Sequence, residues 1–148
     1  MLLTGTYSRS LDEKLRVAIP KPLRLALACP QGGALYVAPG TDESLVVYTE
    51  EAFAELARRL AQSSPTEGHV RAFTRLFYAR AQRVALDRQG RIRIPAELAQ
   101  LAGLRGTVIL LGVQDHLELW AEQRWRTYLE EKRGQFDQIA EAAFRPVG

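Results

Sequence analysis

The sequence is short of cysteine, of histidine and of long apolar runs, and each shortage excludes a class of protein. Cys29 is the only cysteine among 148 residues, so an internal disulfide is excluded. His69 and His116 are the only histidines, which argues against a zinc site built from protein ligands alone. The longest apolar runs, such as 108–111, fall far short of the roughly 20 residues that a membrane span needs.

The beginning of the chain lacks the basic segment, apolar core and cleavage site of a secretory signal. We therefore expect a soluble globular protein of the cytoplasm that does not associate with membranes. The length fits one domain or a closely fused pair, and an apolar content of 47% suffices for an ordinary core.

The net charge of +3 is too small to indicate a nucleic-acid partner, but the charge is unevenly distributed along the chain. Residues 1–40 carry five basic and two acidic side chains, and residues 63–106 carry eight and three. Residues 41–62 carry two and five, and residues 107–148 carry five and seven. A field concentrated on one part of a surface can steer a polyanion in a way that an even distribution cannot. The alternative is that these Arg and Lys residues only solvate strands.

Both basic stretches contain a copy of one motif. Residues 86–98 read LDRQGRIRIPAEL, and residues 11–23, at a constant offset of 75, read LDEKLRVAIPKPL. Six of the thirteen positions are identical. The identical pairs are Leu11 with Leu86, Asp12 with Asp87, Arg16 with Arg91, Ile19 with Ile94, Pro20 with Pro95, and Leu23 with Leu98.

The same succession of elements is predicted around each motif. Segments with alternating apolar and polar residues, or rich in β-branched residues, are expected to be strands. They are 6–11, 16–19, 34–38 and 45–48 around the first motif, and 83–86, 91–94, 107–111 and 116–120 around the second. Short helices are expected at 23–28 and 96–102, and at the later strands the offset falls from 75 to 72.

Three longer helices are also predicted. Thr49 is a good N-cap for the first, and Ser64 and Glu67 have the spacing of a capping box for the second, at 65–81. The third, at 122–144, repeats large apolar residues at helical spacing, which indicates a core or a subunit interface. Those residues are Trp125, Leu129, Phe136 and Ile139.

Each copy is too small to bury its own strand faces, so we expect the two copies to interlock around a pseudo-twofold axis. The expected fold class is α+β, with two interlocked β-repeats forming a small barrel that is decorated by helices. We place the first repeat and its helix at 1–62, a connecting helix at 63–81, the second repeat at 82–126 and a C-terminal helix at 127–148.

The residue types in the repeated turn are suited to binding DNA. In each copy an Asp precedes an Arg by four positions, so the carboxylate can accept hydrogen bonds from turn amides and pair with the guanidinium. We expect Asp12 and Asp87 to stabilise the turns in this way, and a purely structural role for the pairs remains an alternative. Arginine is suited to bidentate contacts with phosphate and guanine, and a two-stranded ribbon can enter a DNA groove. The candidate DNA contacts are Arg16, Arg91, Lys14, Arg88 and Arg93.

The paired Asp-x-x-x-Arg-x-x-Ile-Pro segments resemble the SpoVT/AbrB class of DNA-binding folds. Together with Gly5-Thr6-Tyr7, a capped helix between the copies and the run GVQDHLELW at 112–120, they resemble the MraZ family of bacterial transcriptional regulators. In this resemblance the two repeats are AbrB-like, and Arg16 and Arg91 are the expected DNA contacts.

The resemblance implies a sequence-specific regulator of the operon for cell division and cell-wall synthesis, associated with the nucleoid. Its partners would be double-stranded DNA carrying repeated promoter boxes and further copies of itself in a ring-shaped homo-oligomer. It implies no cofactor and no small-molecule ligand.

One departure from the family pattern concerns the first turn. The family's first copy usually has glycine directly before the Arg, as Gly90 stands in the second copy here, but this chain has Leu15. A positive φ costs leucine roughly 1 kcal/mol or more. Either the first turn has another conformation or it is strained, and the second copy is therefore the expected primary contact.

Two other functions are compatible with parts of the sequence. AbrB-type antitoxins bind DNA and also wrap a toxin with an extended tail, but the helix predicted at 122–144 differs from a polar disordered tail. An enzyme could share a proton between Asp12 and Asp87, yet each Asp has an Arg beside it and no phosphate-cradling loop is present. We therefore expect no catalytic site, and we expect His69 and His116 to face solvent.

Overall fold

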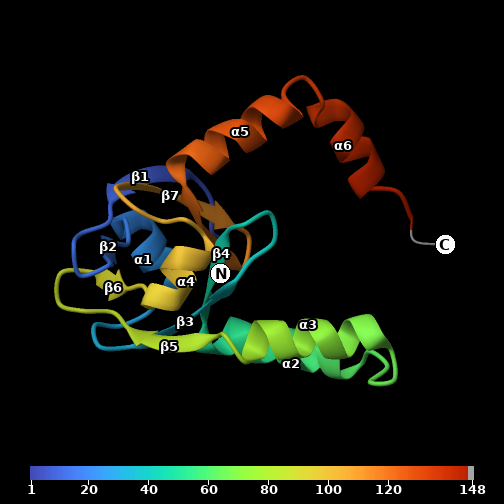
Figure 1. The fold of residues 1–148 in the computed structure, drawn as a ribbon, viewed down its shortest axis with the longest axis horizontal. Helices are drawn as coiled ribbons and strands as arrows, with labels where there is room; N and C mark the ends of the chain where they lie inside the picture. Colours follow the sequence, from blue (N-terminus) through green and yellow to red (C-terminus); the bar gives the residue numbers. More distant parts are fainter. Residues whose placement is uncertain (147–148) are drawn as a thin grey trace.

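The computed structural model describes residues 1–146, as eight strands and six helices (Figure 1). The strands are β1 (Thr6–Ser10), β2 (Arg16–Ala18), β3 (Ala34–Pro39), β4 (Leu45–Thr49), β5 (Gln82–Ala85), β6 (Arg91–Arg93), β7 (Thr107–Val113) and β8 (His116–Ala121). The helices are α1 (Lys21–Leu27), α2 (Glu50–Ala61), α3 (Gly68–Tyr78), α4 (Ala96–Leu101), α5 (Glu122–Lys132) and α6 (Phe136–Ala143).

Six strands form one open antiparallel sheet in the order β1-β7-β8-β4-β3-β5, and β2 and β6 form a separate two-stranded ribbon. The α+β class is therefore confirmed, but the predicted barrel is wrong because the edge strands β1 and β5 do not pair with each other. The ribbon does not close the sheet either, since β2 and β6 pair with each other and with neither edge strand. Pro20 and Pro95 follow those strands closely and have no N–H to extend the pairing.

The two sequence copies exchange strands within the large sheet. Strand β1 of the first copy pairs with β7 of the second, and β5 of the second copy pairs with β3 of the first. Strands β4 and β8, which correspond at the offset of 72, pair with each other at the centre, where Val46 is opposite Glu118. Each copy thus completes the sheet of the other.

The main core lies between the large sheet and a layer formed by the ribbon, α1 and α4. Val17 and Ile92, at 0% and 1% exposure, are opposite each other in the ribbon and point into this core. Leu23 from α1 and Leu98 from α4 are buried beside them. The ribbon is therefore fixed by apolar burial on one side, which leaves its other side to solvent.

The opposite face of the sheet is covered in two parts. The hairpin of α2 and α3 packs on Tyr48 through Phe53 and Phe77, and the first turns of α5 pack on Trp120 through Trp125. In Figure 1 both helical pairs project from the same side of the sheet. None of the helices in residues 1–146 has the length and apolar character needed to cross a membrane.

Two of the predicted helices differ in the structure. Helix α3 begins at Gly68, so the predicted capping box is wrong: the Ser64 hydroxyl bonds to Thr66 rather than to Glu67. The single C-terminal helix is also wrong, because it breaks into α5 and α6. Gly134 lies between them with φ of 75°, a left-handed conformation that interrupts a helix.

Candidate nucleic-acid interface

The two repeated turns have the same hydrogen bonds. In the first, Asp12 Oδ1 accepts from the backbone N–H groups of Lys14 at 2.9 Å and Arg16 at 2.8 Å, and Oδ2 accepts from Arg16 Nε at 2.7 Å. In the second, Asp87 Oδ1 accepts from the backbone N–H groups of Gln89 at 2.8 Å and Arg91 at 2.9 Å, and Oδ2 accepts from Arg91 Nε at 3.0 Å.

These contacts keep both carboxylates ionised. The backbone hydrogen bonds from Arg16 and Arg91 are the largest cause that lowers the pKa of Asp12 and of Asp87, and the guanidinium of each Arg adds to it. Each Asp thus orients its Arg through Nε, and the hydrogen bonds that the Asp accepts leave the terminal nitrogens of that Arg available to a further anion.

Leu15 adopts the conformation that its glycine counterpart adopts. Its φ is 61°, against 74° for Gly90, and both residues donate to the carbonyl of the turn Asp, at 2.9 and 3.0 Å. Of the two alternatives that the sequence left open, the strained turn is the one observed. The side chain of Leu15 is half-buried and packs against the core, which offsets part of the cost.

The surroundings of the two turns explain why one has glycine and the other leucine. The Arg24 guanidinium lies against Gly90, where an added Cβ would approach Arg24 Cζ to 2.8 Å. Arg24 is held there because its Nε donates to the Ile19 carbonyl at 2.9 Å. At the offset of 75 the counterpart of Arg24 is Ala99, which has no side chain long enough to crowd Leu15.

The ribbon gathers three arginines on its outer face. Arg16 is directly opposite Arg93, and Ala18 is directly opposite Arg91. Side chains of opposed residues and of alternate residues share a face, so these four lie on the side away from Val17 and Ile92. The ribbon therefore has an apolar inner face and a cationic outer face.

The five predicted contacts divide into two groups. Arg16, Arg91 and Arg93 are together on the ribbon, and the side chains of Arg16 and Arg91 are 31% and 28% exposed. Lys14 and Arg88 are exposed in the two turns that end the ribbon. Within residues 1–146, no carboxylate lies within 4.0 Å of the charged atoms of Lys14, Arg88 or Arg93.

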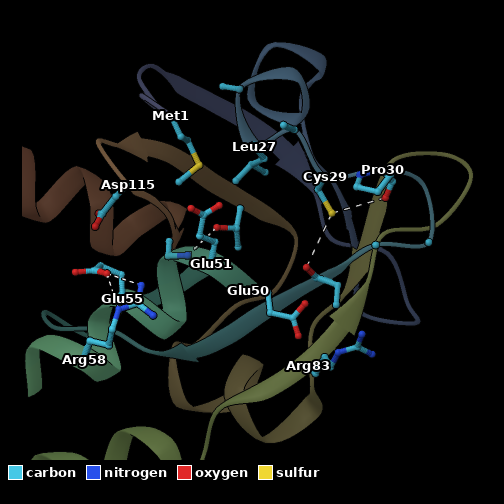
Figure 2. Close-up of a pocket in the computed structure, with 17 residues that line it drawn as sticks. Met1, Leu27, Cys29, Pro30, Glu50, Glu51, Glu55, Arg58, Arg83 and Asp115 are labelled. Atoms are coloured by element: carbon cyan, nitrogen blue, oxygen red, sulfur yellow. Dashed lines mark hydrogen bonds and ion pairs between the residues drawn. The ribbon is translucent and has the colours of Figure 1, made fainter. Parts of the chain in front are cut away.

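A groove elsewhere on the molecule has the opposite electrostatic character. It has a volume of about 860 Å³ and lies between the end of α1, β3 and the start of α2 (Figure 2). Four carboxylates and two arginines line it, so it would repel a polyanion; they are Glu50, Glu51, Glu55, Asp115, Arg58 and Arg83. Cys29 also lines it, and burial raises the pKa of its thiol, which makes the thiol less reactive.

The prediction that His116 faces solvent is wrong. Its side chain is 16% exposed and lies between two carboxylates, with Nδ1 at 2.8 Å from Asp115 and Nε2 at 3.1 Å from Glu118. The ring also stacks on Tyr48, with the centroids 5.2 Å apart. The signal in the sequence was Asp-His-x-Glu, because residues 116 and 118 share a strand face.

This cluster favours a charged imidazole. Burial opposes the charge, but the hydrogen bonds to Glu118 and Asp115 outweigh it and raise the pKa of His116. The same bond from His116 lowers the pKa of Glu118. Arg59 of α2 reaches Asp115 at 3.8 Å, so the cluster also ties α2 to the β7–β8 turn.

Comparison with known proteins gives one family over almost the whole chain. Residues 2–76 and 77–146 each match the family described as "MraZ protein, putative antitoxin-like". The transcriptional regulator MraZ of Rhodococcus jostii is 39% identical over 146 residues, covering 99% of both chains. Those of Saccharopolyspora erythraea and Moorella thermoacetica are 37% and 34% identical over 140 residues, covering 95% of each chain.

Proposed function

The chain belongs to the MraZ family of transcriptional regulators, which are not enzymes, and we propose that it binds double-stranded DNA through the β2–β6 ribbon. Arg16 and Arg91 are the principal contacts in this proposal, and Arg93, Lys14 and Arg88 contact the DNA beside them. Asp12 and Asp87 stabilise the turns and orient the two principal arginines.

The observation that carries the proposal is the outer face of the ribbon. Arg16, Arg91 and Arg93 share that face, and the buried pair Val17 and Ile92 fixes the ribbon from behind. An arginine that is already oriented loses little conformational entropy when it binds phosphate or guanine, and its planar fork suits both.

The ribbon also has the symmetry that suits a DNA duplex. The Ile19 N–H donates to the Gly90 carbonyl at 2.8 Å, and their counterparts repeat the bond, with the Ile94 N–H donating to the Leu15 carbonyl at 2.8 Å. We infer from this reciprocity a pseudo-twofold axis between β2 and β6. Arg16 and Arg91 would then approach the two strands of a groove in equivalent ways.

One ribbon offers few cations, so we propose that affinity comes from several ribbons. A ring-shaped homo-oligomer that presents its ribbons to successive DNA boxes would raise the effective concentration of each further contact. The boxes would lie upstream of the operon for cell division and cell-wall synthesis, which places the protein in the cytoplasm at the nucleoid.

Binding to the upstream DNA of the protein's own operon tests the proposal. Fluorescence anisotropy should show tight binding to that duplex and weak binding to a scrambled duplex of equal composition. Arg91→Ala should lose affinity by roughly 10-fold or more, since one bidentate contact contributes about 1–3 kcal/mol. Arg16→Ala should lose somewhat less, because the second copy also carries Arg93 where the first has Ala18.

Arg126 provides the matched control, because its side chain is 66% exposed on α5, away from the ribbon. Arg126→Ala should bind DNA within about twofold of wild type. Wild-type affinity in both ribbon variants would assign the Asp–Arg pairs a structural role alone.

A further inference from the structure

Helix α6 exposes an apolar face that nothing in residues 1–146 covers. Phe136 is 79% exposed and Ile139 is 44% exposed, and Phe144, directly after the helix, is 88% exposed. Positions 136, 139, 140 and 143 recur at helical spacing and form one stripe. Adjacent apolar side chains that are exposed together are typical of an interaction surface.

The α2–α3 hairpin has an apolar groove of about 540 Å³ on its surface. Small and apolar side chains from both helices line most of it, which leaves room for a further helix. These lining side chains include Ala57, Leu60, Ala61, Val70, Thr74 and Tyr78.

The charges beside these two surfaces are opposite. Helix α6 carries Asp137 and Glu141 one turn apart and no basic residue. Helix α3 carries Arg71 and Arg75, which both line the groove, and no acidic residue. In the described part of the chain, neither Arg75 nor the two carboxylates of α6 form an ion pair.

We propose that α6 of one copy of this chain binds in the α2–α3 groove of a second copy. Phe136 and Ile139 would enter the groove, and Asp137 and Glu141 would face Arg71 and Arg75. The inference rests on the homo-oligomer of the proposed function and assigns its interface.

A second copy is favoured over the chain's own groove because of how α5 is anchored. Trp125 and Tyr128 of α5 pack on Trp120, with ring centroids 5.1 Å from it. Figure 1 shows that α5, held in this way, carries α6 to a position separated from the α2–α3 hairpin. Copies can bind one another without disturbing that packing.

The contact joins two different surfaces, so it is heterologous. Each copy would donate α6 and accept α6, and contacts of this kind close into a ring when the rotation between copies permits. One two-turn helix in a groove is a small interface, and ring closure adds the effect of many such contacts.

Complementation between two variants tests the interface. Phe136→Asp removes the apolar anchor of α6, and Ala57→Glu places a carboxylate in the groove at an exposed position. Each variant alone should sediment as a monomer in analytical ultracentrifugation, whereas the wild type forms the oligomer. An equimolar mixture should form heterodimers, because it restores one intact helix and one intact groove. Leu25→Asp, at a leucine that is 70% exposed on α1, is the control and should keep the wild-type mass.

Charge reversals provide a second pair of variants that affects only exposed side chains. Arg75→Glu and Glu141→Arg should each weaken assembly by about 10-fold or more, and the protein carrying both should recover most of it. A mixture of Phe136→Asp and Ala57→Glu that stays monomeric would overturn the interface, as would a Phe136→Asp protein with wild-type mass.

DNA binding is measured separately, on a short duplex with a single box. The interface is supported if the variants stay monomeric and still bind the single-box duplex with the affinity of the wild type. Absence of DNA binding by the wild type would instead contradict the proposed function, and it would leave the sedimentation result to decide the interface on its own.

Discussion

The two motif copies differ in how the residue before each Arg, Leu15 or Gly90, is accommodated in its turn. Leu15 and Gly90 have the same left-handed backbone conformation. The side chain of Leu15 packs on the core, whereas Gly90 lies against the Arg24 guanidinium. Arg24 in one copy and Ala99 in the other account for this difference. The departure from the family pattern at Leu15 therefore leaves the hydrogen bonds of Asp12 and Arg16 intact.

Gly90 and Arg24 should be energetically coupled. Gly90→Ala should reduce the free energy of unfolding by about 1–2 kcal/mol, because it adds a Cβ at a positive φ and against the Arg24 guanidinium. In a Gly90→Ala/Arg24→Ala protein the loss should be smaller than the sum of the single losses, since the contact is absent. Urea denaturation of the four proteins gives the cycle, and strict additivity would contradict the proposed crowding.

Helix α2 is tied to the central strands through the cluster around His116. Its ring lies between Asp115 and Glu118, and Asp115 also meets Arg59 of α2. The folded pKa of His116 is raised, so the stability that this residue contributes is complete below its unfolded pKa of about 6.5. That contribution is lost as the pH rises through the folded pKa.

The melting temperature of the wild type should therefore decline above about pH 6.5 more steeply than that of His116→Gln. The difference between the two melting curves, measured by circular dichroism from pH 5 to 9, isolates the contribution of His116. His69→Gln is the control, because His69 is 82% exposed on α3. Parallel profiles for wild type and His116→Gln would show that the cluster does not stabilise the fold.

The sequence predicted the positions of the strands and most helices better than it predicted which strands pair. The alternation at Val17 and Ile92 indicated which faces are buried, since that pattern depends on neighbouring residues. The open sheet could not be predicted in this way, because it depends on which strands pair across 45 to 105 residues of sequence. Likewise, the burial of His116 depends on Tyr48, which is distant in sequence, and Gly134 alone did not indicate a helix break.

Across the molecule as described, clusters of opposite charge lie on different surfaces. The ribbon is cationic on its outer face, the groove near Cys29 is lined by more carboxylates than arginines, and the α5–α6 arm extends away from the sheet (Figure 1). DNA and further copies of the chain would thus use different surfaces. A ring of copies could bind successive boxes without either contact blocking the other.

DNA affinity should depend steeply on salt. If a ring neutralises six or more phosphates, its affinity should fall on the order of a thousandfold between about 50 and 200 mM salt, because condensed counterions are released on binding. The monomeric Phe136→Asp protein should show a shallower slope on the same multi-box duplex, since it engages fewer phosphates at once. Equal slopes for the two proteins would contradict the multivalent account.

The most direct test asks whether DNA lies on the ribbon. Ala18 is on the outer face beside the three arginines, and Cys29 is the only natural cysteine, so Cys29→Ser gives a background without thiols. In that background, Ala18→Cys should form a disulfide with a duplex that carries a tethered thiol inside one box. Ala72→Cys, at an exposed position on α3, should not. Crosslinking at position 72 instead of position 18, by protein that binds the duplex normally, would contradict the ribbon as the DNA-binding surface.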